Sequence, residues 1–150
     1  MKLCLADVIK TGRQSNHYRS DPFIIAEIGV NHENNMDLAK TLIEQAALGG
    51  ASAAKFQTYR ATTLASKDSP AYWDTSQETI SNQRELFSKY DKFWKNEYET
   101  LKIACESLDI EFLSTPFDIE SANFLNDLVD SFKISSSDIT NRPFIEYLCR

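Results

Sequence analysis

Residues 23–32 read FIIAEIGVNH, and their pattern is the first indication of the fold class. Five of its first eight residues are Phe, Ile or Val, which is typical of a buried β-strand. Glu27 nevertheless lies inside this run, and Asn31 and His32 follow soon after Gly29. An unpaired carboxylate is costly in a protein core. The pattern therefore predicts a strand that carries Glu27 to the face where the active site lies.

Strand and helix patterns alternate along the rest of the chain. Apolar residues recur at helical spacing between Leu38 and Ala47, with Asn35 or Asp37 as the cap and Gly49 as the stop. The predicted strands are residues 23–29, 53–59, 110–116 and 131–137, after a short strand near 3–9, and the predicted helices lie within residues 34–50, 95–109, 118–129 and 141–150.

This order predicts an α/β protein with parallel strands and right-handed crossover connections. Neither the glycine-rich fingerprint of dinucleotide-binding proteins nor a P-loop follows any of the predicted strands. In a β/α barrel the active site is built at the C-terminal ends of the strands, so the residues at those ends are the candidates for function.

Residues 60–92 interrupt the alternation with a segment rich in Ser, Thr, Asp and Gln. The segment also carries four aromatic residues that favour partial order: Tyr72, Trp73, Phe87 and Tyr90. A connection of this length in a compact domain is usually functional or disordered. We therefore expect a partly ordered excursion, with a helix possible at residues 86–94.

Polar side chains follow each of the four predicted strands. Two lysines suit a phosphate or a carboxylate, hydroxyl groups can complete the contacts, and carboxylates can orient substrate hydroxyls or move protons. The sequence therefore predicts one pocket for an anionic ligand. Its candidate residues are Glu27, Lys55, Gln57, Ser114, Thr115, Lys133, Ser135, Ser136, Ser137 and Asp138.

Most of these residues, and His32, also have a purely structural interpretation. A lysine near a strand end often extends into solvent, and Ser or Thr often caps a turn. Glu27 can form a structural ion pair with Lys55 on the next strand. A single histidine such as His32 more often makes one structural hydrogen bond than binds a ligand.

Composition limits the class of protein further. The chain has 150 residues and a formal net charge of −6, which argues against general binding to nucleic acid. The three cysteines have no metal-site spacing and are interpreted as reduced thiols, which points to the cytoplasm. No apolar run approaches the roughly 20 residues of a membrane helix, so no membrane association is expected.

Four motifs together resemble the sialic acid synthase family, which includes the N-acetylneuraminate, legionaminate and pseudaminate synthases. They are FIIAEIGVNHENNMDLAKTLIEQA (23–46), AAKFQT (53–58), FLSTPFD (112–118) and FKISSSDITNRPFIE (132–146). The resemblance runs from about residue 22 to the end. It implies a TIM (β/α)8-type barrel of which about the first four βα units are present. Residues 1–21 would be a lead-in arm, and residues 22–150 the N-terminal portion of the barrel, without its C-terminal half and the antifreeze-like domain.

The resemblance implies a condensation of phosphoenolpyruvate with an N-acylated amino sugar to a nonulosonic acid, with release of phosphate. It also assigns roles by motif. Glu27 would lie near the reacting carbons, and Asp138 would bind the sugar. The SSSD form of this last motif differs from the SGE form of many members, which leaves the sugar open. The phosphoenolpyruvate ligands would be Lys55, Gln57, Thr115, Lys133 and Ser136.

The family uses a divalent metal, manganese or magnesium, and its two metal-binding histidines lie on later strands. His17 and His32 do not match them. A whole barrel usually takes about 250 residues. We therefore expect a fragment that is inactive alone and belongs to a homodimer in its full-length form. The alternatives are a non-catalytic remnant or split subunit that needs a complementing half, and another phosphoenolpyruvate-dependent deoxy-sugar-acid synthase.

Overall fold

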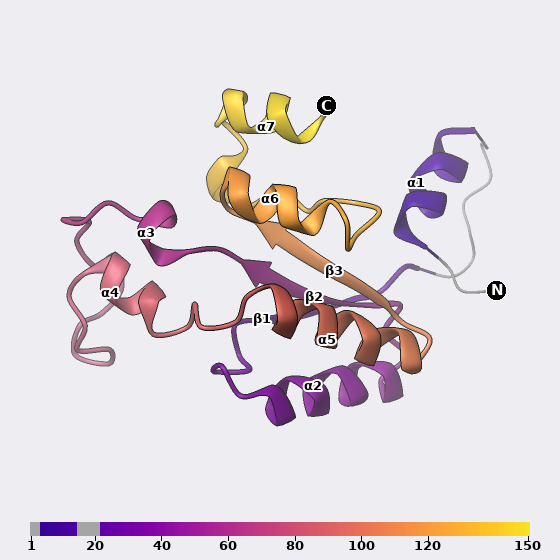
Figure 1. Ribbon diagram of the computed structural model, residues 1–150, viewed down its shortest axis with the longest axis horizontal. Helices are drawn as coiled ribbons and strands as arrows, with labels where there is room; N and C mark the ends of the chain where they lie inside the picture. The colour runs from indigo at the N-terminus through magenta and orange to yellow at the C-terminus, as the bar shows by residue number, and fades with distance from the viewer. Residues whose placement is uncertain (1–3, 15–21) are drawn as a thin grey trace.

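A three-stranded parallel sheet organises the chain, as a computed structural model shows for residues 4–14 and 22–150 (Figure 1). Its strands β1 (Ile25–Gly29), β2 (Ala53–Thr58) and β3 (Glu111–Pro116) lie side by side in chain order. Lys55 in the central strand pairs with Glu27 on one side and with Leu113 on the other. The α/β class and the first three strands of the prediction are therefore confirmed, with β1 two residues shorter at its start.

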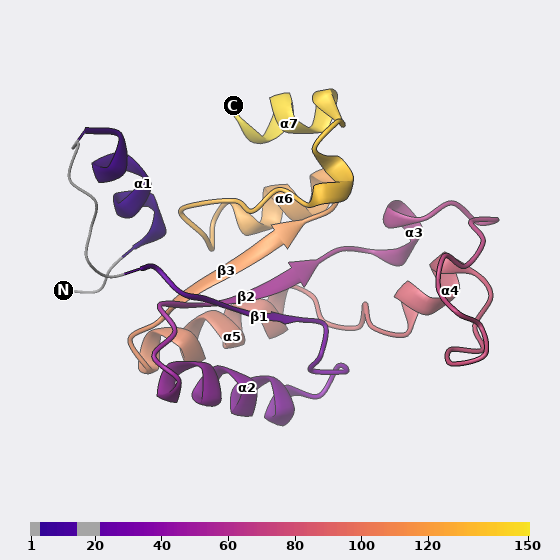
Figure 2. The same ribbon diagram turned by 180° about the vertical axis from the view of Figure 1, so that it is seen from behind.

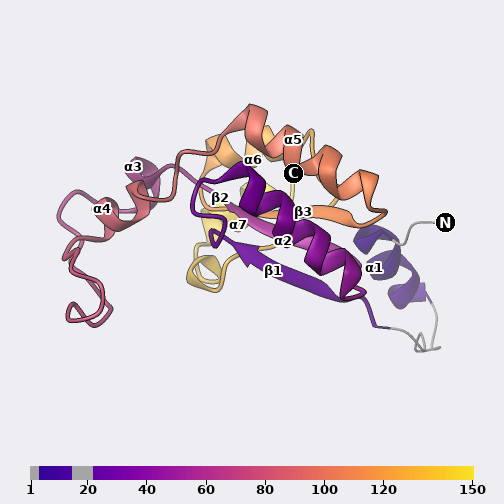
Figure 3. The same ribbon diagram turned by 90° about the horizontal axis from the view of Figure 1, so that it is seen from below.

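Two helices, α2 (Met36–Leu48) and α5 (Lys95–Ser107), run antiparallel to the strands and cover one face of the sheet (Figure 3). The predicted cap Asn35 accepts hydrogen bonds from the backbone N–H groups of Asp37 and Leu38, so it satisfies two free donors at the start of α2. The core between helices and sheet consists of Ile28, Ala39, Ile43, Ala54, Phe56, Phe93, Tyr98, Leu101, Cys105, Ile110, Phe112 and Leu125.

The start of the described chain is a helix, α1 (Leu5–Gln14), and the predicted short strand near residues 3–9 is wrong. The backbone N–H of Leu5 donates to the carboxylate of Glu111 at 2.7 Å. Glu111 is the first residue of β3 and is almost fully buried. A carboxylate at a helix N-terminus satisfies a free backbone donor and complements the helix dipole. This contact spans 106 residues, so no local pattern could reveal it.

The predicted fourth strand at residues 131–137 is also wrong. Residues 131–135 carry no strand assignment, and Ser136–Asp138 form a short 3₁₀ helix, η1. Ser135 accepts a hydrogen bond from the backbone N–H of Ser137, a local bond that competes with pairing in a sheet. The helices predicted on either side of this segment do form. α6 (Ile119–Leu125) is capped by Asp118, and α7 (Arg142–Leu148) has Pro143 in its first turn.

The excursion at residues 60–92 is ordered and projects beyond the C-terminal ends of the strands (Figures 1 and 2). It contains two short helices, α3 (Ala61–Leu64) and α4 (Gln83–Ser88), so the possible helix at residues 86–94 is only partly correct. Its ends are tied together, because the backbone N–H of Ala61 donates to the carboxylate of Asp91 at 2.9 Å. Among the helices of residues 4–14 and 22–150, none is long and apolar enough to cross a membrane.

Replacing Glu111 with Gln is expected to weaken the attachment of α1 to the sheet. The amide keeps the size of the side chain but loses the charge that faces the helix N-terminus, an effect of about 1–2 kcal/mol. Amide hydrogen exchange at Val8 would show faster exchange in the variant, with unchanged exchange at Leu101 in the core. Equal protection of Val8 in both proteins would contradict this role of Glu111.

Candidate active site

The face of the sheet opposite α2 and α5 carries the polar side chains. Successive residues of a strand point to opposite faces. Ala54 and Phe56 belong to the core under the helices, so Lys55 and Gln57 of β2 point to the other face. Thr115 is the register partner of Gln57 on β3, which brings it to the same face. The structure therefore brings three of the predicted residues together on two adjacent strands.

Lys55 forms an ion pair with Glu27 across the sheet. The two residues are register partners on β2 and β1, so the pair follows directly from the strand alignment. The Lys55 side chain is 7% exposed, whereas that of Glu27 is 57% exposed. The ammonium is thus buried and the carboxylate remains open to solvent. The ion pair between Glu27 and Lys55 that the sequence suggested is therefore present, and the Glu27 carboxylate stays largely open to solvent.

Gly29 lies next to the side chains of Gln57 and Glu27. A methyl group at position 29 would lie 3.6 Å from Nε2 of Gln57 and 3.8 Å from Oε1 of Glu27. The backbone of Gly29 has φ of +59°, a conformation that side chains with a Cβ rarely adopt. The strand alignment also shifts between Glu27 and Gly29, as in a bulge. Glycine at this position therefore permits the turn out of β1 beside these two polar side chains.

Thr115 presents a hydroxyl that has no hydrogen-bond partner within the described structure. The residue is 2% exposed. Buried hydroxyl groups are nearly always hydrogen-bonded, so an unsatisfied one is a candidate ligand contact. Ser114, also predicted for the pocket, points instead to the helix-covered face and shares a 2.7 Å hydrogen bond with Thr58. Its assignment to the pocket is wrong because neighbouring strand residues face opposite ways.

Lys133, Ser136 and Asp138 lie on a separate segment, because the strand predicted to carry them does not form. Lys133 and Ser136 are exposed. Asp138 accepts a hydrogen bond from the side-chain amide of Asn141 at 3.2 Å, a contact within its own turn. The expected placement of these three residues at a strand end is therefore corrected, while their roles as ligands stay predictions.

His32, which the sequence suggested only weakly as a ligand, is a buried residue in the turn after β1. It is 1% exposed, and its ring stacks on Phe93 with centroids 4.4 Å apart. Nδ1 accepts a hydrogen bond from the backbone N–H of Asn34 at 3.2 Å, so the predicted structural hydrogen bond is confirmed. Burial lowers the pKa of His32 to about 4, which keeps the ring neutral at physiological pH.

The residues that the structure describes contain no group of three or more His, Cys, Asp or Glu side chains that could hold a metal ion. The Glu27–Lys55 pair is unsuited to that task, because the ammonium already neutralises the carboxylate. The described part of the chain therefore does not fit the divalent metal that the family resemblance implies.

Protonation of His32 is expected to destabilise the fold in acid. Its pKa of 6.5 in the unfolded chain falls to about 4 in the folded one, so the unfolded state binds more protons between these values. The free energy of unfolding should therefore decrease as pH falls through this window, by up to about 3 kcal/mol, and this contribution should level off below it. Urea denaturation of the wild type and of His32→Gln at several pH values would measure the difference; identical pH dependence of the two proteins would contradict the assignment.

Comparison with known proteins agrees with the motifs. The model of the NeuB family matches residues 42–150. The chain is 41% identical to N,N'-diacetyllegionaminic acid synthase of Legionella pneumophila, over 83% of this chain and 36% of that protein. It is 32% identical to human N-acetylneuraminate-9-phosphate synthase, over 83% of this chain and 35% of that protein.

A solved structure shows the same fold. The crystal structure of N-acetylneuraminic acid synthetase from Leptospira borgpetersenii, in complex with citrate, has a TM-score of 0.67 and 33% sequence identity, and the match covers 84% of this chain and 40% of that one. The chain thus spans a little over a third of the length of the relatives that it matches. The family model covers more than half of its residues, and on this basis the chain belongs to the NeuB family of sialic acid synthases.

Proposed function

We propose that this chain provides part of the active site of a sialic-acid-type synthase, a transferase that joins phosphoenolpyruvate to an N-acylated amino sugar. The product is a nonulosonic acid, and phosphate is released. The observation that supports the proposal most directly is a buried ammonium, that of Lys55, beside the unsatisfied hydroxyl of Thr115 on one face of a parallel sheet. Strands β1–β3 would be the first strands of a TIM barrel, and the face would line its interior.

The residues on this face have properties that suit an anion with a phosphate and a carboxylate. The Lys55 ammonium has three donor hydrogens, so it can hold Glu27 and a ligand oxygen together. The Thr115 hydroxyl and the Gln57 amide each add a donor from adjacent strands. Hydrogen-bond donors that are buried and already held in position need little reorganisation when the anion binds. This is the basis of electrostatic stabilisation in active sites.

Glu27 is the group best placed to act on the reacting atoms. In the proposed reaction, carbon 3 of phosphoenolpyruvate attacks the aldehyde carbon of the sugar and forms the new C–C bond. Water then adds to carbon 2, and phosphate leaves by cleavage of its C–O bond. The exposed carboxylate of Glu27, held by Lys55, can orient a substrate hydroxyl or accept the proton of the incoming water.

The segment after α6 would complete the ligand contacts. We propose that Lys133 and Ser136 approach the same anion and that Asp138 binds the sugar. A manganese or magnesium ion, part of the proposal for the whole enzyme, would need ligands from beyond the described residues. Cytoplasmic location and a homodimeric full-length enzyme are proposed on the same family basis.

A second candidate is a subunit that acts only with a complementing half. The two candidates share the Lys55 face and differ only in what surrounds it.

Replacing Lys55 with Met is expected to weaken phosphoenolpyruvate binding by about tenfold or more, since a charge-assisted contact contributes roughly 1.5–3 kcal/mol. Titration followed by phosphorus NMR would give the dissociation constants. Thr115→Val should weaken binding less, because it removes one neutral donor. Lys40→Met, at an exposed lysine on α2, is the matched control. The assignment fails if Lys55→Met binds as tightly as Lys40→Met.

Turnover is expected when the chain is mixed with the separately expressed C-terminal portion of a relative, such as the Legionella pneumophila synthase. Phosphate release should then require both phosphoenolpyruvate and an N-acyl amino sugar. Release with a simple aldose phosphate would favour a deoxy-sugar-acid synthase instead. Stable association of the two pieces without any release would favour the non-catalytic remnant.

A further inference from the structure

An exposed aromatic ring, Tyr72, packs against a half-buried one, Trp73, on the excursion at residues 60–92. Tyr72 is 75% exposed, and its ring meets that of Trp73 edge to face, with centroids 5.0 Å apart and an interplanar angle of 77°. Buried packing cannot explain the conformation of a ring that lies mostly in water. Large aromatic side chains left in solvent commonly mark a contact surface.

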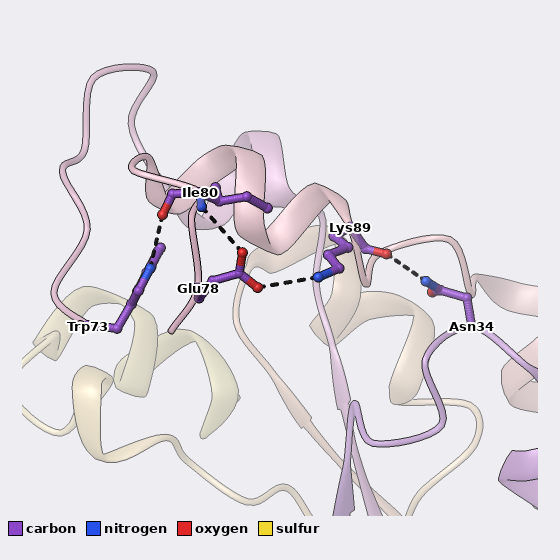
Figure 4. Close-up of polar contacts among 5 residues, drawn as sticks. All are labelled: Asn34, Trp73, Glu78, Ile80 and Lys89. Carbon is purple, nitrogen blue, oxygen red and sulfur yellow. Dashed lines mark hydrogen bonds and ion pairs between the residues drawn. The ribbon is translucent and has the colours of Figure 1, made fainter. Parts of the chain in front are cut away.

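The pair is held in place by its backbone surroundings. The indole Nε1–H of Trp73 donates to the carbonyl of Ile80 at 3.0 Å (Figure 4), so the polar edge of the ring is satisfied from within the excursion. The backbone N–H of Ala71 donates to the carbonyl of Ser81 at 2.9 Å and closes the loop that carries both rings. A closed loop therefore carries both rings, and their position does not depend on side-chain contacts alone.

A continuous line of polar contacts connects this loop to the exit of β1 (Figure 4). The backbone N–H of Ile80 donates to Glu78, whose other oxygen forms an ion pair with Lys89 at 3.3 Å. The carbonyl of Lys89 accepts from the side-chain amide of Asn34 at 2.7 Å. Asn34 lies in the turn between β1, which carries Glu27, and α2. The rings are thus anchored to the end of the sheet where the candidate active site opens.

The charges beside the rings favour a neutral partner over an anion. Asp74 directly follows Trp73, and a hydrogen bond from the backbone N–H of Ser76 lowers the pKa of its carboxyl. The carboxylate of Glu78 belongs to the same loop, where it accepts from the backbone N–H of Ile80, and Lys89 is already engaged by Glu78. A phosphate or carboxylate ligand would be repelled here, whereas hydroxyl and amide N–H groups would find acceptors.

We propose that Tyr72 and Trp73 form a sugar-binding platform, on which the apolar C–H face of an N-acyl amino sugar packs while its polar groups reach Asp74. The ligand class rests on the proposed function. The platform itself is a second contact for the sugar, apart from the Glu27–Lys55 face, and would select among sugars at the entrance to the site.

Saturation-transfer NMR with N-acetylmannosamine as the probe tests the platform on the full chain. The wild type should transfer saturation to the ring protons of the sugar, and Tyr72→Ser should weaken the apparent affinity by about tenfold. Tyr72→Phe should retain it, because the aromatic face is kept. Leu48→Ser, at a residue that is 81% exposed on α2, is the matched control and should bind as the wild type does.

Two results would overturn the platform: equal affinity of Tyr72→Ser and the wild type, or an equal loss in Leu48→Ser. The indole N–H signal of Trp73 provides a second measurement, since it should shift on addition of the sugar in the wild type and in Lys55→Met alike. Loss of phosphoenolpyruvate binding without loss of this shift would separate the two sites. A failed platform would leave the phosphoenolpyruvate titration unaffected, so the two proposals fail independently.

Discussion

A lysine ammonium that is almost wholly removed from water needs an opposite charge beside it, and this requirement shapes the candidate site. Lys55 lies in the central strand, where it is shielded by neighbours on both sides, and its partner Glu27 occupies the aligned position on β1. The alignment of β1 with β2 therefore determines both the stability of the buried charge and the location of the exposed carboxylate. Gly29 completes the arrangement, because its positive φ lets the chain turn out of β1 directly beside this pair.

The same strand ends support the excursion at residues 60–92. Asp118, the cap of α6, accepts from the backbone N–H of Arg60 at 3.3 Å and from the hydroxyl of Thr63 at 2.7 Å. Asn34 holds the other end through Lys89 and Lys92. A long polar connection thus gains order from hydrogen bonds at its two ends, which reduces the number of conformations it can adopt. These contacts therefore give the loop that carries Tyr72 and Trp73 a defined position.

Sequence patterns predicted well those features that depend on neighbouring residues. The apolar spacing of α2 and α5, the caps Asn35 and Asp118, and the strands β2 and β3 all follow from local rules. The fourth strand failed because an extended segment becomes a strand only when a partner accepts its backbone hydrogen bonds, and the serines at 135–137 bond locally instead. The helix α1 was missed because its N-terminus is satisfied by Glu111, far away in the chain.

The class of fold, the family and the residue types at the strand ends can be read from the sequence, since they depend on composition and on spacing along one chain. Which of those residues meet depends on the tertiary structure. Strand register places Glu27 opposite Lys55 and Gln57 opposite Thr115. The alternation of side chains along β3 points Ser114 to the other face, where it bonds to Thr58. Burial then left the hydroxyl of Thr115 without a partner and kept His32 neutral. These outcomes depend on distances through space between separate strands and helices, which no local pattern contains.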